Sequence, residues 1–202
     1  VGRGYRRFAE LDVGDADLVI TSKYPAWMVS HPRHVVWMFH PLRGLYEGYR
    51  AMGLPLVPGE VAPEVQDVLN EVAGPPRRDR VPEVLDALDA AIASLGEDHP
   101  DLAHPGPVGR TVVHWLDRVA LAPEHIARHV ALSRTVAVRP EYFPIDVRVR
   151  VAHAPSSLPS ARPPGASGDE RRALFTASRL DGPKRIGLII DAMRRVPADV
   201  DL

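Results

Sequence analysis

The sequence predicts an α/β protein built on Rossmann-like parallel sheets, and three observations point to this class. Short β-branched apolar runs alternate with helix-like segments, as in repeated strand, helix, strand units. The run from Val35 to Phe39 is apolar throughout, which is typical of a strand buried on both faces of a parallel sheet. After a proline-rich stretch, residues 171–202 again show strand, turn and helix, so a second α/β domain is expected to start there.

Composition narrows the classes of function. The chain has 202 residues, 45% of them hydrophobic, and a formal net charge of −1, so no overall attraction to nucleic acid is expected. The absence of cysteine excludes disulfides, thiolate zinc sites and a cysteine nucleophile. Because no apolar run is long enough to cross a bilayer and no secretory signal is found, we expect a cytoplasmic protein. The alternative location is peripheral, at the inner face of the membrane.

Two strands are predicted near the start of the chain. The first is "DLVIT" (17–21), followed by Ser22 and Lys23, and the second is Val35 to Phe39, followed by His40. Residues 51–110 are rich in proline and acid, and they contain two segments of helical periodicity, 62–74 and 81–96, that each end in glycine. We interpret 51–110 as a solvated helical insertion without chemistry of its own.

The region from Thr111 predicts a further strand, helix, strand unit. A helix over 111–126 is interrupted by Pro123, and a strand over 127–133 leads to a short helix with Ser133 at its N-cap. The alternating segment 146–155 predicts a strand with one exposed face, parallel to the previous one. Residues 1–155 are therefore expected to form a partial N-terminal domain.

The composition of 156–170, rich in proline, serine and glycine, predicts an interdomain linker. A strand over 171–178 and a helix over 183–196 follow, with Ile186, Ile189, Ile190 and Met193 on one apolar face. The chain lacks an initial methionine and stops soon after this helix, so we expect it to be a piece of a longer polypeptide.

The turn "SRLDGPKRIG" (178–187) joins this strand to this helix. Such a turn places free helix N–H groups at the carboxyl edge of a sheet, with Arg179 and Lys184 on either side, and this arrangement favours a phosphate group. The alternative, given equal weight, is that Arg179 pairs with Asp181 and Lys184 is only solvated. The phosphate loop G-x-x-x-x-G-K-[ST] and the dinucleotide fingerprint G-x-G-x-x-G do not occur in the chain.

Three stretches resemble retaining glycosyltransferases of the GT-B fold, family 4 type. The segment "LFTASRLDGPKRIGLIIDAMRRVP" is similar to the opening of their C-terminal, donor-binding domain. The segment 17–49 is similar to part of their acceptor-side domain, and 116–155 is similar to its last unit. Ser178 and Gly187 depart from the residues common in the family, and the 51–110 insertion is longer than usual.

The resemblance implies transfer of a sugar from a nucleoside-diphosphate sugar to an acceptor hydroxyl with retention of configuration. Arg179 and Lys184 would bind the donor diphosphate. His40 is the candidate catalytic residue on the acceptor side, and Lys23 and Arg43 are expected to line the same cleft. A strand-end histidine satisfied by a backbone carbonyl is an equally weighted reading of His40. The acceptor would be a carbohydrate, lipid or small molecule, and the 202 residues alone are expected to be inactive.

Some histidines have spacings that occur among metal ligands. His31, His34 and His40 are close in sequence, and His125 and His129 have the i, i+4 spacing that places two rings on one helix face. The segment "HIARH" lacks the glutamate of zinc proteases, and the family chemistry needs no divalent cation, so we expect no metal and no cofactor. The alternative to an enzyme is a non-catalytic α/β binding or scaffold module with an incidental phosphate-like turn.

Overall fold

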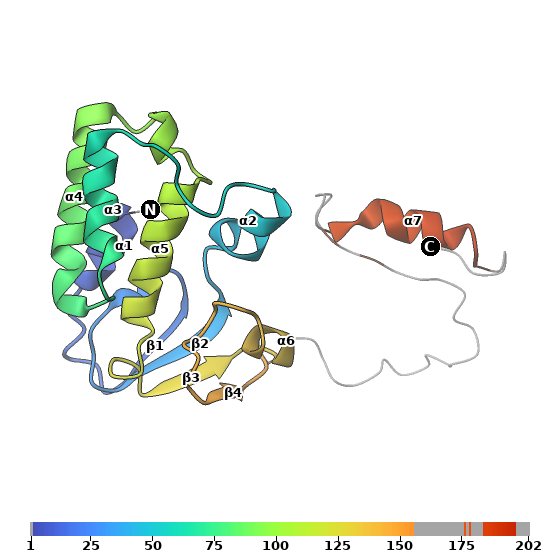
Figure 1. Cartoon of the computed structure of the whole chain (residues 1–202). Helices are drawn as coiled ribbons and strands as arrows, with labels where there is room; N and C mark the ends of the chain where they lie inside the picture. The colour runs from blue at the N-terminus through green and yellow to red at the C-terminus, as the bar shows by residue number, and fades with distance from the viewer. Residues whose placement is uncertain (1, 156–175, 177, 179–183, 197–202) are drawn as a thin grey trace. The chain divides into compact units, whose positions relative to one another are not determined.

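The computed structural model describes residues 2–155, 176, 178 and 184–196. The chain divides into two units, Val1–Ala154 and Pro155–Leu202. The first unit is an α/β structure in which four parallel strands form one sheet in the order β1-β2-β3-β4 (Figure 1). The predicted α/β class and the parallel direction of the strands are therefore confirmed for this unit.

The strands lie close to their predicted positions: β1 is Val19–Lys23, β2 is His34–His40, β3 is Arg128–Ala131 and β4 is Val149–Val151. Lys23 and His40 are the last residues of β1 and β2, whereas the sequence pattern placed them just after the strands. Because all four strands are parallel, their carboxyl ends meet at one edge of the sheet.

The helices of this unit are α1 (Gly2–Ala9), α2 (Glu47–Ala51), α3 (Pro63–Ala73), α4 (Val81–Leu95), α5 (Pro107–Ala120) and α6 (Arg134–Ala137), with short 3-10 helices η1 (Ala26–Met28), η2 (Arg43–Leu45), η3 (Arg78–Arg80) and η4 (Pro100–Leu102). The helix predicted over 111–126 begins earlier and ends at Ala120, before Pro123. The predicted cap of α6 is confirmed, since the Ser133 hydroxyl accepts a hydrogen bond from the Val136 N–H at 3.2 Å.

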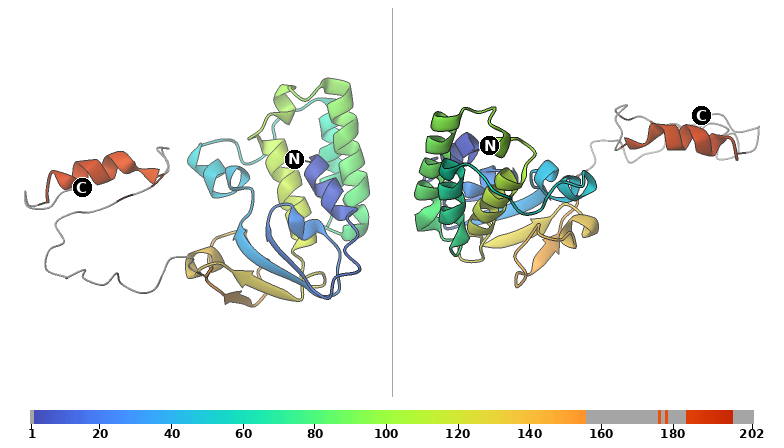
Figure 2. Two further views of the ribbon diagram at one scale, coloured as in Figure 1. Left: turned by 180° about the vertical axis from the view of Figure 1, so that it is seen from behind. Right: turned by 45° about the horizontal axis from the view of Figure 1, so that its top comes forward.

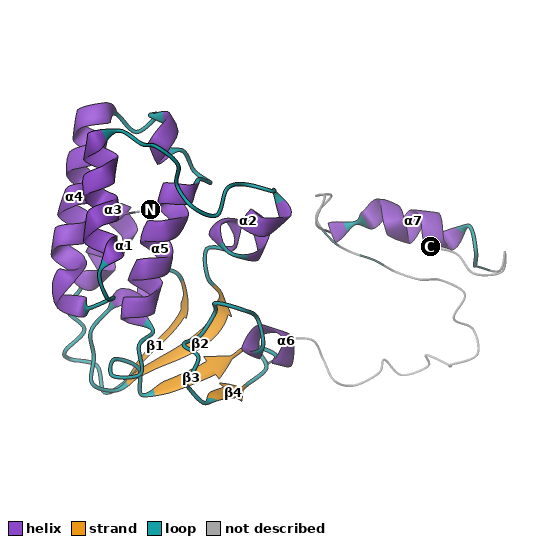
Figure 3. Ribbon diagram, in the orientation of Figure 1, coloured by secondary structure: helices purple, strands orange, loops and turns teal. Residues whose placement is uncertain are grey.

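Helices α3 and α4 belong to the core, which corrects the prediction of a solvated insertion at 51–110. Their apolar stripes bury Val65, Val68 and Val84 completely, and Ala91 lies fully inside as well. Figure 3 shows both helices in the same layer as α5. The spacing of apolar residues did predict the helices, but periodicity alone does not indicate how deeply a helix is packed.

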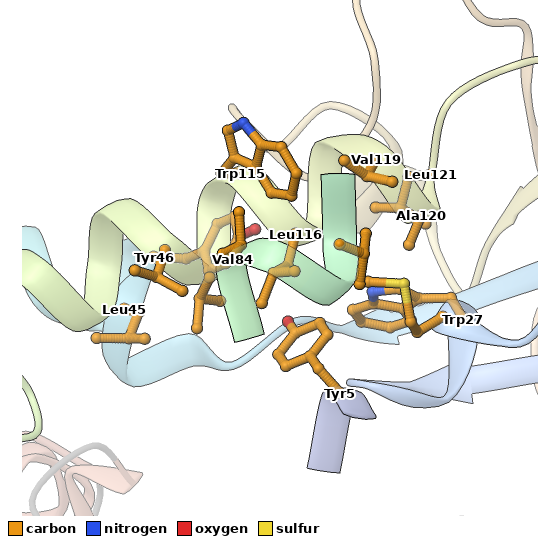
Figure 4. Close-up of a cluster of buried hydrophobic side chains, with 14 of the residues drawn as sticks. Tyr5, Trp27, Leu45, Tyr46, Val84, Trp115, Leu116, Val119, Ala120 and Leu121 are labelled. Carbon is orange, nitrogen blue, oxygen red and sulfur yellow. The ribbon is translucent and has the colours of Figure 1, made fainter. Parts of the chain in front are cut away.

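The aromatic core is built around α5. Tyr5 from α1 and Trp27 from η1 are both 0% exposed and lie against this helix, close to Leu116 (Figure 4). Trp115 is also 0% exposed, and its indole N–H donates to the carbonyl of Gly74 at 3.2 Å. These side chains fasten α1, η1 and the end of α3 to one central helix, so the residues before β1 are part of the same core.

The larger helices cover one face of the sheet, as both views in Figure 2 show. On this face Val36 and Met38 are 0% exposed. On the other face Trp37 and Phe39 are only half-buried, and Ile20 is 58% exposed. Within the described residues, β2 is thus buried on one face, which differs from the burial on both faces that its unbroken apolar run predicts.

The second unit is described mainly through α7 (Ile186–Met193). The helix begins after Pro183, so Pro183 is not its first residue, and Arg185 precedes it in the left-handed region with φ of 52°. The four apolar residues predicted for this helix lie on α7. None of them is buried within the part of the chain that the structure describes. The predicted linker 156–170, Arg179 and most of the predicted strand 171–178 lie outside the described residues. No helix in the described ranges has both the length and the apolar character needed to span a membrane.

Candidate functional site at the carboxyl edge of the sheet

Lys23 and His40 are neighbours across the first two strands. They are paired in the register of β1 and β2, after a shift that follows Thr21. Both therefore lie at the carboxyl edge, where open parallel sheets bind ligands. Lys23 is exposed and His40 is half-buried, so this pair combines a cation in solvent with a partly shielded imidazole.

The imidazole of His40 has a defined orientation. Its Nδ1 lies 2.8 Å from the carbonyl oxygen of Pro41. A carbonyl oxygen only accepts hydrogen bonds, so Nδ1 carries the proton and donates it. Nε2 of the neutral ring is then an acceptor, and no partner for it is found among the described residues. The structure therefore shows the backbone contact that the alternative interpretation of His40 predicts, and this contact leaves Nε2 as the hydrogen-bond acceptor of the ring.

Arg43 follows β2 in η2, and its side chain is 56% exposed. Its Nε donates to Oε1 of Glu47 at 2.5 Å. Arg139, which follows α6, donates from one terminal nitrogen to the same Oε1 at 2.9 Å. The hydroxyl of Tyr142 donates to Oε2 at 2.8 Å. One carboxylate thus holds two guanidinium groups and a phenol, and we call these four residues the Glu47 cluster.

A second ion-pair group lies beside the Glu47 cluster. Glu141, adjacent to Tyr142 in the chain, is 3.1 Å from a terminal nitrogen of Arg110 and 3.7 Å from one of Arg50. Arg50 is on α2, like Glu47, so both groups connect α2 with the segment after α6. Figure 1 shows α2 and α6 at the end of the sheet where β2 and β3 finish.

Burial raises the pKa of Glu47, but the hydrogen bonds from Tyr142, its own backbone N–H and Arg43 outweigh this effect and lower the pKa below its usual value. Glu47 is therefore ionised at neutral pH. An ionised carboxylate that is already bonded to three donors is a poor proton acceptor, so its role is to hold the two arginines in place.

Sequence reasoning missed Glu47, Arg139 and Tyr142. The partners of Glu47 in the segment after α6 are more than 90 residues away in the chain, and no local pattern connects them. The i, i+4 spacing of Arg43 and Glu47 was the one signal available, and such spacing is common on solvated helix surfaces.

Lys184, the described member of the predicted diphosphate pair, is exposed and lies just before α7. Its proposed partner Arg179 is outside the described residues. Lys23 and His40 are therefore neighbours at the carboxyl edge in the first unit, Arg43 follows them in η2, and Lys184 belongs to the second unit.

The histidines serve other roles where the structure describes them. Nε2 of His31 is 2.8 Å from the carbonyl of Ala16, and Nε2 of His129 is 2.8 Å from that of Leu121. His129 is in β3 and His125 is in the preceding turn, so these two do not share a helix face as their spacing suggested. In the described ranges, no group of three or more histidine or acidic residues is arranged to hold a metal ion.

Asp117 forms a buried polar centre that the sequence analysis did not single out. It lies on α5 and is 2% exposed. Its Oδ1 accepts hydrogen bonds from the Tyr5 hydroxyl at 2.5 Å and the Trp27 indole N–H at 2.8 Å. Its Oδ2 accepts one from the Tyr46 hydroxyl at 2.6 Å. Tyr46 directly precedes α2, so this centre connects the core to the segment that carries Glu47.

Two buried groups respond to pH in opposite directions. Burial raises the pKa of Asp117 from 3.8 to about 6, against the effect of its three hydrogen bonds. Burial lowers the pKa of His34 from 6.5 to about 4. Between pH 4 and 6 the folded chain binds more protons than the unfolded chain at Asp117, and fewer at His34. The Asp117 contribution to stability therefore falls as pH rises, while the His34 contribution rises.

In Asp117→Asn the pH-dependent contribution of Asp117 is removed and that of His34 remains, so the two contributions can be measured separately. The free energy of unfolding of the unmodified chain minus that of the variant should fall by roughly 2 kcal/mol as pH rises from 3.8 to 6. Urea unfolding at half-unit pH intervals measures this difference. Asp67→Asn, at an exposed position on α3, is the control and should leave the difference flat. Parallel profiles for the unmodified chain and Asp117→Asn would contradict the assignment.

Comparison with known proteins gave no assignment of the chain: no protein-family model matches it, and neither the curated proteins nor the solved structures contain a significant match.

Proposed function

We propose that the chain is part of a retaining glycosyltransferase that moves a sugar from a nucleoside-diphosphate sugar to an acceptor hydroxyl. The observation that carries the proposal is the position of Lys23, His40 and Arg43 at one edge of a parallel sheet. The sequence predicts all three residues on the acceptor side, and they come from β1, β2 and η2. The resemblance of the turn around Lys184 to a donor-binding turn gives further support.

The chemistry follows from the groups present. In such a transfer the bond between the anomeric carbon and the diphosphate oxygen breaks, and negative charge develops on the departing diphosphate. Arg179 and Lys184 would stabilise this charge electrostatically. Nε2 of His40 would accept a hydrogen bond from the acceptor or from the transferred sugar, with its ring held by the Pro41 carbonyl. The product in biology would be a polysaccharide, a glycolipid or a glycosylated natural product.

A non-catalytic binding module is the second candidate. One observation favours it: Arg43 is engaged by Glu47, so its presence at the sheet edge has a structural explanation that needs no acceptor. The two candidates differ in what they bind, because a donor site recognises the nucleoside diphosphate whereas a structural ion pair does not.

Calorimetric titration with a panel of nucleotide sugars and nucleoside diphosphates tests the proposal. The 202-residue chain should bind nucleoside diphosphates weakly, since it holds only part of the predicted donor site, and the protein containing the whole donor domain should bind one nucleotide sugar selectively. A matched nucleoside without phosphates is the control. If neither protein distinguishes the diphosphate from the nucleoside, the non-catalytic module is the better interpretation.

A further inference from the structure

We propose that the acceptor carries a phosphate group, bound at the carboxyl edge by Arg43 and Lys23, with Arg139 beside Arg43 on the Glu47 carboxylate. This inference rests on the proposed function, which it deepens by naming the acceptor class. The argument starts from the Glu47 cluster, in which two guanidinium groups donate to the same carboxylate oxygen. They are therefore held close together, although like charges at such a separation repel each other.

The charges of the cluster do not balance. Glu47 contributes one negative charge, whereas Arg43 and Arg139 contribute two positive charges. The neighbouring group repeats the imbalance, because Glu141 faces both Arg50 and Arg110. Lys23 adds a further positive charge at the end of β1. Among the residues of these two ion-pair groups and Lys23, cations thus outnumber carboxylates, although the chain as a whole has a formal net charge of −1.

The remaining hydrogen-bond donors of Arg43 are available to a ligand. A guanidinium group has five N–H donors, and Glu47 occupies the Nε donor of Arg43. The side chain is 56% exposed, and no other partner for it is found in the described ranges. A terminal guanidinium edge matches two oxygens of a phosphate, and its Nε contact with Glu47 fixes its direction before the ligand arrives. Arg139, 32% exposed, strengthens the positive potential at the same place.

The proposed phosphate site lies at the same edge of the sheet as His40. Arg43 follows His40 closely in the chain, and Lys23 is the register partner of His40 on β1. A phosphate held by Arg43 and Lys23 would place the rest of the acceptor beside Nε2 of His40, which has no partner among the described residues and would accept a hydrogen bond from the acceptor hydroxyl. The cations would therefore orient the acceptor, and His40 would meet its hydroxyl.

The experiment compares glucose 6-phosphate with glucose by calorimetry on the full 202-residue chain. We expect the phosphorylated sugar to bind and glucose not to bind. Lys23→Gln and Arg43→Gln should each weaken binding of glucose 6-phosphate about tenfold or more. The matched control is Arg33→Gln, an exposed arginine before β2 at the opposite edge of the sheet, which should bind as the unmodified chain does. The Lys23 side chain is exposed and makes no hydrogen bond or ion pair with the part of the chain that the structure describes, so Lys23→Gln keeps the test valid if Arg43→Gln unfolds.

A second arm identifies the source of the phosphate. Vesicles containing phosphatidic acid are compared with vesicles of phosphatidylcholine, using the same variants. Retention on phosphatidic acid that Lys23→Gln abolishes would support a lipid phosphate, and binding of the soluble sugar phosphate alone would support a soluble acceptor. Equal losses in Lys23→Gln and Arg33→Gln, or equal binding of glucose and glucose 6-phosphate together with no retention on vesicles, would overturn the proposal.

The same titrations separate this inference from the proposed function. Binding of a nucleoside diphosphate that depends on Lys184, without binding of either phosphate probe, would overturn the phosphorylated acceptor and support the transferase. Binding of glucose 6-phosphate that depends on Lys23 and Arg43, without any nucleotide binding by the protein with the whole donor domain, would support the phosphate site and overturn the transferase.

Discussion

Asp117→Ala is expected to lower the free energy of unfolding by about 3 kcal/mol or more. The carboxylate accepts hydrogen bonds from Tyr5, Trp27 and Tyr46, and all three side chains are at most 3% exposed. Alanine would leave three buried donors without an acceptor and would create a cavity beside α5, and each unsatisfied buried group costs about 1–3 kcal/mol. Denaturant unfolding at pH 7 measures the loss.

Asp117→Asn distinguishes a lost acceptor from a lost charge. The amide oxygen still accepts two hydrogen bonds, and the amide N–H can donate to the Tyr46 hydroxyl, so the loss at pH 7 should be much smaller than for alanine. Asp67→Ala on the exposed face of α3 is the matched control and should stay within about 0.5 kcal/mol of the unmodified chain. Equal stability of Asp117→Ala and Asp67→Ala would show that the three donors find other partners.

Lys184→Ala is expected to slow sugar transfer by roughly 30- to 1000-fold, which corresponds to about 2–4 kcal/mol at the transition state. The reason is that Lys184 would stabilise the charge that develops on the departing diphosphate. Steady-state kinetics in the protein that contains the whole donor domain measures this effect. In the 202-residue chain the matching observable is weaker binding of a nucleoside diphosphate.

Arg194→Ala is the control for this experiment. Arg194 lies just beyond the other end of α7, and its side chain is 83% exposed. The substitution therefore removes one positive charge near the same helix without changing the predicted donor turn. Its turnover and donor affinity should match those of the unmodified protein. If Lys184→Ala behaves as Arg194→Ala does, Lys184 is a solvated surface residue. The donor site would then lack the one residue of the predicted pair that the structure describes.

Much of the fold was predictable because local patterns determine it. The apolar run of β2, the periodicity of α3 and α4 and the serine before α6 each indicated the element that forms there. The carboxyl-edge position of Lys23, His40 and Arg43 also followed from sequence, since parallel strands end at one edge and each residue directly ends or follows a predicted strand.

The sequence by itself determined the class of the fold, the parallel direction of the strands and three residues at the candidate site. The tertiary structure decided that α3 and α4 pack into the core, that Asp117 is buried among three donors and that Glu47 holds Arg43 and Arg139 together. The physical reason is the separation along the sequence between the residues that interact. Periodicity and caps act over a few residues, whereas the partners of Asp117 and Glu47 are up to 112 residues away and meet only when the chain is folded.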